Sequence, residues 1–366
     1  MTKILHITGS MNMAGQETFI MNVFRNIDRK KFKFEFLLSA PEKTYYEDEI
    51  INLGGKIHRI SPKPKENRIK RVVKRIRASK NFFENHRDYD CIHLHTCGVG
   101  NLIELYFAWK SGIPKRVIHS HNNSTLVRSK ILFNILKKVS LLFATDLFAC
   151  SKQAGYWLFG KKARFRVIPN AIDVKNYDFD MEIRNKMREE IGVGNKVAIC
   201  NIGRFSEQKN QLFLIDVFKE IIKIDPNVKL YIVGDGELKS DIISRINKYQ
   251  LESFVELLGL RKDVNRLLQA MDLFLFPSKY EGLGIVAVEA QASGLLTIVS
   301  DTLPKEVEIT NLIKKISLND DAEKWATDIV GYIRQYKRTG SNINDFKEKG
   351  YDITSLIKFL STYYRS

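Results

Sequence analysis

Strand-like apolar runs alternate with helix-like amphipathic runs along most of the chain, and this alternation constrains the fold more than any other feature. The order is typical of a parallel sheet with helices on both faces, a doubly wound α/β domain. Such a domain binds ligands beyond the carboxyl ends of its strands, so the loops after Thr8, His95 and Ser120 should carry the chemistry of the first half. The strand-like runs of that half are 3–8, 32–38, 56–60, 91–95, 116–120, 146–149 and 166–168.

The alternation stops between about residues 168 and 196, where a Pro169-Asn170 turn leads into a charged stretch, and then restarts. We therefore predict two Rossmann-like domains, 1–170 and 196–340, joined by a connector at 171–195 and facing each other across a cleft, a preferred place for ligands. Residues 341–366 should be largely helical and pack back on the first domain. The strand-like runs of the second domain are 197–203, 228–234, 254–258, 273–276 and 296–300.

The excess of positive over negative charge lies in the first half of the chain. Residues 1–170 hold 31 Lys and Arg against 13 Asp and Glu, whereas residues 171–366 hold 28 against 29. This asymmetry suggests an anionic partner for the first half. The basic segments 68–77 and 129–138 have apolar residues at helical spacing and could lie on an anionic membrane. The alternative is an ordinary solvated helix that covers the sheet. No nucleic-acid motif accompanies the charge, so we do not expect a nucleic-acid partner.

The composition also excludes some classes. No apolar run approaches the length of a membrane span, and residues 1–8 are too short and too polar for a signal peptide. We expect a cytoplasmic protein, peripheral at the inner face of the cell membrane. The four cysteines lack metal-ligand spacing and are predicted to be buried thiols; they are Cys91, Cys97, Cys150 and Cys200.

The stretch from Pro277 to Ala290 has the most specific pattern. It follows a buried strand, contains a Gly-flanked turn and runs into a helix. The N–H groups of a first helical turn and the helix dipole favour an anion such as phosphate. Glu281 and Glu289 bracket this turn and would accept hydrogen bonds from hydroxyls on either side of a phosphate. A nucleotide-sugar has this arrangement of hydroxyls and phosphates.

The loop Gly203–Asn210 follows the first strand of the second domain. A leaving diphosphate needs positive charge where negative charge develops, and Arg204 and Lys209 could supply it. The alternative is a pair of solvated surface charges. The position at the carboxyl end of a strand favours the functional interpretation.

Together these segments resemble the large GT-B family of retaining glycosyltransferases, family four in the usual classification, including bacterial capsular and exopolysaccharide enzymes. The resemblance covers essentially the whole chain. It is carried by five motifs: Val167-Ile168-Pro169-Asn170-Ala171-Ile172-Asp173, Gly203-Arg204-x4-Lys209-Asn210, Val233-Gly234-Asp235-Gly236, Leu258-Gly259, and Pro277-Ser278-x2-Glu281-Gly282-x-Gly284-x4-Glu289-Ala290-x2-Ser293-Gly294.

The resemblance implies roles for matching residues of the second domain. Glu281 would contact the donor sugar and Glu289 the ribose hydroxyls, while Arg204 and Lys209 would stabilise the departing diphosphate. Backbone N–H groups around Leu283, Gly284 and Ile285 would hold that diphosphate. The backbone around Arg261 would read the base.

In the first domain, the resemblance implies that Gly15 lets its loop approach the phosphates. The family usually shows Gly-Gly there, where this chain has Ala14-Gly15, and Phe is common where it has Leu283. A family histidine contacts the donor sugar or the acceptor, and His121 is favoured over His119 for that position. The alternative for both residues is a histidine whose role is structural and whose ring is held by backbone hydrogen bonds.

Two features suggest a metal, and neither is convincing from the sequence. His93 and His95 point to one sheet face and, with His119 and His121, could gather near one sheet edge, but no third-ligand spacing typical of zinc appears. Asp178-Phe179-Asp180 is a short acidic triplet, but it lies in the connector and is best read as chance. We predict no metal and no cofactor.

The sequence therefore predicts a retaining glycosyltransferase that moves a sugar from a nucleotide-sugar, a UDP-sugar by preference, to a hydroxyl of a saccharide or lipid-linked acceptor. The acceptor would be a precursor of a bacterial capsule or exopolysaccharide. Two alternatives stay open: a sugar-nucleotide epimerase on the same fold, and a non-enzymatic basic module that binds membranes.

Overall fold

The computed structural model describes residues 1–12, 14–60, 68–96, 102–122, 130–338 and 340–366. These residues form two compact units, Met1–Ala171 with Ile353–Ser366, and Ile172–Asp352, and each is described by itself. Parts of the segments discussed above lie outside the described residues: Met13, Cys97, Asn123 and Ser129.

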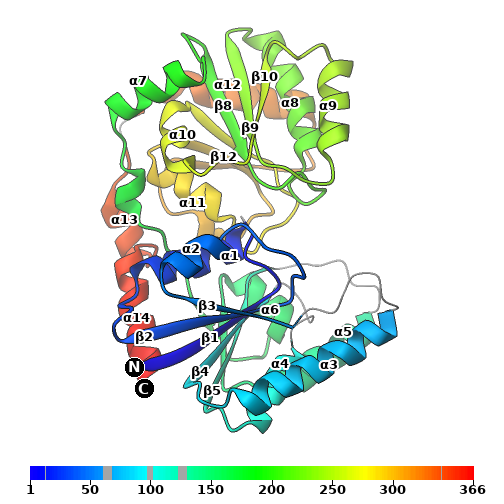
Figure 1. Cartoon of the computed structure of the whole chain (residues 1–366). Coiled ribbons are helices and arrows are strands. Elements are labelled where there is room, and N and C mark those ends of the chain that lie inside the picture. Colours follow the sequence, from blue (N-terminus) through cyan, green and yellow to red (C-terminus); the bar gives the residue numbers. More distant parts are fainter. Residues whose placement is uncertain (13, 61–67, 97–101, 123–129, 339) are drawn as a thin grey trace. The chain divides into compact units, whose positions relative to one another are not determined.

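The first unit is built on a parallel sheet that, within the described residues, has seven strands in the order β3-β2-β1-β4-β5-β6-β7 (Figure 1). The order reverses at β1, so the loops after β1 and β4 lie beside the switch point where doubly wound sheets bind ligands. The strands are β1 (Thr2–Thr8), β2 (Phe32–Leu38), β3 (Lys56–Arg59), β4 (Cys91–Thr96), β5 (Lys115–Ser120), β6 (Asp146–Ala149) and β7 (Arg166–Val167). The helices are α1 (Gly15–Asn26), α2 (Glu47–Asn52), α3 (Arg68–Asn85), α4 (Ile103–Lys110), α5 (Lys130–Leu141), α6 (Lys152–Phe159) and α14 (Ile353–Arg365).

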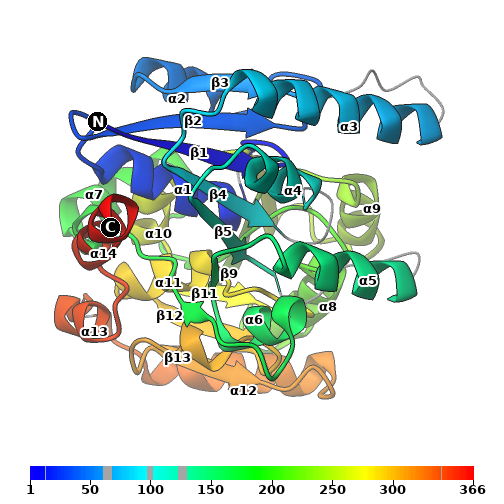
Figure 2. The ribbon, with the colours of Figure 1, turned by 90° about the horizontal axis from the view of Figure 1, so that it is seen from below.

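The last helix of the chain completes the core of the first unit. On α14 the apolar residues Leu356 and Leu360 recur at helical spacing and are buried in the same hydrophobic core as side chains of α1 and β2. Tyr364 is buried in the same core. In Figure 2, α14 is seen end-on beside α1.

The second unit repeats the design with a parallel sheet that, in the part of it that the structure describes, has six strands in the order β10-β9-β8-β11-β12-β13. Here the order reverses between β8 and β11. The strands are β8 (Val197–Ile202), β9 (Val228–Val233), β10 (Val255–Gly259), β11 (Leu273–Phe276), β12 (Leu296–Ser300) and β13 (Ile313–Ile316). The helices are η1 (Val174–Tyr177), α7 (Met181–Glu190), α8 (Gln211–Ile224), α9 (Lys239–Lys248), α10 (Val264–Ala270), α11 (Ile285–Ala292), η2 (Lys305–Val307), α12 (Ala322–Gln335) and α13 (Ile343–Glu348).

The predicted fold class, two doubly wound α/β sheets, is confirmed. The segment predicted as a connector, 171–195, instead supplies η1 and the helix α7 to the second unit, except for Ala171. The prediction missed α7 because its apolar positions are few; Asp180 begins the helix by accepting hydrogen bonds from the N–H groups of Glu182 and Ile183. It also missed β13, an edge strand with two lysines.

The expectations about membrane spans and cysteines can be compared with the described residues. Among them, we find no helix with both the length and the apolar character that crossing a bilayer requires. The thiols of Cys91, Cys150 and Cys200 are buried and unbridged, as predicted.

Candidate active site

Two loops meet at the switch point of the second sheet, 203–210 after β8 and 277–284 after β11. The N–H of Lys279 donates to the carbonyl of Gln208 (2.8 Å), and Gln208 Nε2 donates to the carbonyl of Tyr280 (2.9 Å). Asn210 Nδ2 donates to the carbonyl of Pro277 (3.1 Å). The adjacency of β8 and β11 thus brings together two motifs that are about 70 residues apart in the sequence.

Lys209 and Glu281 form an ion pair at this junction. Lys209 Nζ lies 2.6 Å from Glu281 Oε1, and the two side chains are only 18% and 8% exposed. The ammonium also lies 4.7 Å from the ring centroid of Phe276. A charge-assisted contact this short and this sheltered fixes the cation in place more firmly than a surface pair would.

Helix α11 begins beside that pair. Gly284 precedes it with φ of 85°, a left-handed conformation that an L side chain rarely adopts, and an added Cβ would lie 3.3 Å from Phe276. Leu283 is 2% exposed, and all side chains of α11 are buried, starting at Ile285. The N–H groups of a first helical turn generally lack partners within the helix. In α11 the N–H of Ala287 donates to the Gly284 carbonyl (2.9 Å), so the N–H groups before it are the ones that can donate to an anion.

Glu289 lies one helical turn further along α11 and is 7% exposed. Burial raises the pKa of its carboxyl to about 7, although a hydrogen bond from Tyr177 of η1 acts in the opposite direction. A carboxyl whose pKa is raised to near 7 by the fold is typical of a functional site. Tyr177 was not singled out from the sequence, since nothing in its spacing relates it to Glu289.

Arg204 lies on the surface, with its side chain 71% exposed and Nη2 3.0 Å from Glu237. The sequence places Arg204 in the same loop as Lys209. In the structure Lys209 pairs with Glu281, whereas Arg204 pairs with Glu237. Its loop is held by close backbone packing, since a Cβ on Gly236 would lie 2.4 Å from the Phe205 carbonyl oxygen. The Arg204 side chain is therefore exposed, while the backbone next to it is held by close packing.

Arg261 follows β10, which is an edge strand of this sheet. Its Nε donates to Asp263 Oδ1 at 2.8 Å, and this hydrogen bond is the main reason that the pKa of the Asp263 carboxyl is lowered. The Arg261 side chain is thus paired with Asp263, so the backbone of this loop is the part available to a ligand.

The first unit presents its own candidates at the loop after β1. Gly15 is the first residue of α1, after Ala14 in an extended conformation. Glu17, in the first turn, is 8% exposed, and burial raises the pKa of its carboxyl to about 7. Glu17 was not predicted as a site residue from the sequence. Its position two residues after Gly15, the glycine expected to approach the phosphates, could have indicated it.

His121 follows β5 and is 8% exposed, while His119 within β5 is fully buried. The N–H of His121 donates to the Thr96 carbonyl at 3.0 Å, and its Nε2 lies 3.0 Å from His95 Nδ1. Burial lowers the pKa of His121 to about 3, so its ring is neutral at physiological pH. The contact between His121 Nε2 and His95 fixes the orientation of the ring. The other ring nitrogen, Nδ1, can then donate or accept one hydrogen bond, depending on the tautomer.

The acidic triplet of residues 178–180 has local hydrogen-bonding roles. Asp180 begins α7, as described above, and Asp178 Oδ1 accepts from the N–H of Phe179 at 3.1 Å. Both carboxylates of the triplet thus accept hydrogen bonds from nearby backbone N–H groups.

Comparison with known proteins identifies the family. Residues 13–176 match the family model described as Glycosyltransferase Family 4, and residues 183–351 match that of Glycosyl transferases group 1. EpsF of Bacillus subtilis (strain 168), a protein named as a glycosyltransferase, is 31% identical over 337 residues, or 89% of this chain and 86% of EpsF. The chain belongs to glycosyltransferase family 4.

Other relatives of this family 4 glycosyltransferase carry more specific names. CapH of Staphylococcus aureus, a capsular polysaccharide biosynthesis glycosyltransferase, is 24% identical over 100% of this chain and 99% of its own length. An Escherichia coli UDP-Gal:alpha-D-GlcNAc-diphosphoundecaprenol alpha-1,3-galactosyltransferase is 30% identical over 58% of each chain. The crystal structure of Anabaena HepE with UDP and glucose superposes with a TM-score of 0.81 over 100% of both chains at 19% identity, which establishes the GT-B fold. The enzyme is thus a nucleotide-sugar glycosyltransferase.

Proposed function

We propose that this glycosyltransferase retains the anomeric configuration of a UDP-sugar as it transfers the sugar to a hydroxyl of a lipid-linked saccharide, a precursor of a bacterial capsule or exopolysaccharide. The observation that carries the proposal is the sheltered Lys209–Glu281 pair at the N-terminus of α11. The names of CapH and of the Escherichia coli galactosyltransferase support the acceptor class.

In this mechanism the second unit binds the donor through charges of both signs. Lys209, Arg204 and the first-turn N–H groups of α11 stabilise the negative charge of the departing diphosphate. Glu281 accepts hydrogen bonds from the sugar and keeps Lys209 in place, while Glu289 accepts from the ribose. Because these groups supply the positive charge, the transfer itself uses no metal ion.

The acceptor hydroxyl attacks the anomeric carbon from the same face of the sugar from which the diphosphate departs. We assign no protein nucleophile, and the departing phosphate oxygen takes the acceptor's proton, so retention follows without a covalent intermediate. In the first unit, Gly15 lets its loop approach the phosphates, and the neutral His121 hydrogen-bonds a sugar or acceptor hydroxyl.

Equilibrium binding of nucleotides tests the donor site. For UDP, Lys209→Ala should raise Kd about 10–100-fold, because a hydrogen bond to a charged group contributes roughly 1.5–3 kcal/mol. UMP should be affected much less, since it lacks the second phosphate. Lys324→Ala is the matched control, because Lys324 forms an exposed pair with Asp328 in the same unit. Equal affinity of wild type and Lys209→Ala for UDP would contradict the proposal.

A further part of the proposal is that α3 docks on an anionic membrane from the cytoplasmic side. The ordinary alternative has the apolar stripe of α3 packed on the sheet, but Val72, Val73 and Ile76 are 53%, 40% and 40% exposed. On α5, Ile135 and Val139 are 53% and 45% exposed. Exposed apolar residues among lysines and arginines are the pattern that binds anionic bilayers.

Flotation with vesicles containing anionic lipid tests this docking. Replacing Lys70, Arg71 and Arg77 by Ser should weaken binding roughly a hundredfold, at about 1 kcal/mol for each charge. Arg75 is left intact, because its Nη2 lies 3.0 Å from the buried carboxylate of Glu104. The control removes three exposed lysines of the second unit, Lys223, Lys239 and Lys248. Equal binding of the two triple variants at low salt would refute docking through α3.

A further inference from the structure

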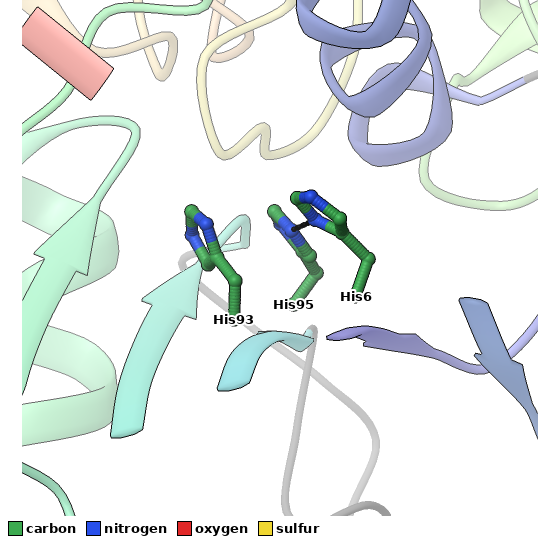
Figure 3. Close-up of side chains that lie close together, drawn as sticks. All are labelled: His6, His93 and His95. Carbon is green, nitrogen blue, oxygen red and sulfur yellow. Dashed lines mark hydrogen bonds between the residues drawn. The ribbon is translucent and has the colours of Figure 1, made fainter. Parts of the chain in front are cut away.

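Five of the seven histidines of the chain gather on one face of the first sheet. They come from the neighbouring strands β1, β4 and β5, and register places His6 opposite His93 and His95 opposite His119. Figure 3 shows the rings of His6, His93 and His95 side by side above these strands. The cluster consists of His6, His93, His95, His119 and His121.

The rings form two rows. In one row, His95 lies between His6 and His121, with nitrogen separations of 3.0 Å on either side. In the other, His93 lies between His119, at 3.2 Å, and the hydroxyl of Tyr364, at 2.7 Å. The rows stack on each other, with ring centroids 4.1 Å apart at both His93–His95 and His119–His121.

Hydrogen bonding within the rows leaves buried nitrogens without partners. Among the described residues, His119 Nε2, His6 Nε2 and His121 Nδ1 have no hydrogen-bond partner. Buried polar atoms are nearly always paired, and leaving one unpaired costs about 1–3 kcal/mol. The orphaned Nε2 of His119 therefore points to a ligand or ion.

We propose that His95, His119 and His121 form a binding site for one divalent transition-metal ion of the Zn²⁺ class. One ligand atom from each of these residues lies within 4.8 Å of the other two. His95 would bind through Nδ1, His121 through Nε2 and His119 through its orphaned Nε2. Three imidazoles with an open fourth position suit Zn²⁺ and Co²⁺.

A second group of three, His6, His93 and His95, has similar spacing but is less accessible. Its members are at most 1% exposed, whereas His121 is 8% exposed and lies at the carboxyl edge of the sheet. In our assignment His6 and His93 become outer partners instead. His6 Nδ1 contacts the rear nitrogen of His95, and His93 Nε2 contacts that of His119. Such partners commonly fix the orientation of metal-binding histidines.

One of the three nitrogen separations is already close to that of a zinc site. Nitrogens that each lie about 2.0–2.1 Å from a tetrahedral zinc ion are roughly 3.3 Å apart, against 3.0 Å between His95 Nδ1 and His121 Nε2. Burial lowers the pKa of all three ligands, so they are in the neutral, metal-binding form. No carboxylate joins the group among the described residues, so we expect hydroxide in the fourth position to offset part of the charge.

Cobalt titration of the chelator-treated 366-residue chain tests the proposal without any sugar nucleotide. We expect one equivalent of Co²⁺ to bind, with the visible absorption of tetrahedral Co²⁺, and Zn²⁺ to displace it. His119→Asn should abolish this signal. His6→Asn, which removes an outer partner, should weaken binding about 10–100-fold.

A variant outside the cluster keeps the test decisive if cluster variants fail to fold. His58 and His86 are the only other histidines of the chain, and replacing both by Asn should leave the Co²⁺ spectrum and stoichiometry unchanged. Loss of the signal in that double variant would overturn the proposal. It would equally be overturned by the absence of saturable binding to the wild type, or by thiolate charge-transfer bands that place the ion at a cysteine.

Discussion

At the scale of single residues, the buried carboxyl of Glu289 lowers the stability of the fold. Its carboxyl is 7% exposed, and its pKa rises from 4.5 to about 7. Because the folded state then holds a proton that the unfolded chain has lost, stability falls as pH rises from about 4.5 to 7. The penalty at pH 8 is up to about 3 kcal/mol. A fold retains such a residue where binding requires it.

Glu289→Gln should therefore separate stability from function. At pH 8 the variant should be more stable than wild type by up to about 3 kcal/mol, and the difference should shrink towards zero as the pH approaches 4.5. UDP binding should be weaker, because a neutral amide accepts ribose hydrogen bonds less strongly. Chemical denaturation at several pH values and calorimetry with UDP measure the two effects. A variant less stable than wild type at pH 8 would contradict this account of Glu289.

Donor binding should also depend on pH through the same residue. Ribose hydroxyls stabilise the ionised carboxylate, so binding of a nucleotide-sugar should release a proton, and affinity should rise with pH up to about 7. Nucleotide-sugars suit this measurement because their diphosphate has no free terminal phosphate to titrate nearby. The dependence should disappear in Glu289→Gln, and its persistence there would assign the titration to another group.

At the scale of elements, the donor site depends on how the loop after β8 is supported. A Cβ on Gly236 would lie 2.4 Å from the carbonyl oxygen and 2.8 Å from the nitrogen of Phe205, next to Arg204. Gly236→Ala must therefore displace this loop, and we expect a loss of about 1–3 kcal/mol in stability together with weaker UDP binding.

Gly331→Ala is the matched control. Gly331 lies within α12, and a Cβ there meets no atom within 4 Å. Alanine in a helix interior is favoured over glycine by roughly 0.5–1 kcal/mol, so this variant should be more stable and bind UDP normally. Thermal denaturation and calorimetry distinguish the pair. Normal UDP binding by a folded Gly236→Ala variant would separate this loop from the donor site.

Most elements could be predicted from the sequence because strand and helix periods differ clearly. Strands β2, β6, β11 and β12 have the predicted bounds. The contacts between motifs were harder to predict. Lys209 and Glu281 could be placed at one sheet edge from strand order, but the pairing of Arg204 with Glu237 depends on side-chain geometry. The histidine cluster arises from register between parallel strands, which spacing along one strand does not reveal.

At the scale of the whole molecule, each unit has a parallel sheet whose strand order reverses, and each places candidate residues in loops beside that reversal. Charge divides the units differently, since the excess of lysine and arginine lies in residues 1–170. We connect the near-neutral second unit with the donor and the basic first unit with the acceptor and the anionic membrane.

A transfer assay tests the central claim most directly. The purified chain is incubated with a panel of UDP-sugars and a polyprenyl-diphosphate-linked saccharide, and the anomeric configuration of the new linkage is determined by NMR. We predict that UDP release needs the acceptor, that the donor's configuration is retained, and that Lys209→Ala lowers kcat about 10²–10³-fold while Lys324→Ala does not. An inverted linkage, isomerised sugar without acceptor, or an unchanged rate in Lys209→Ala would contradict the account.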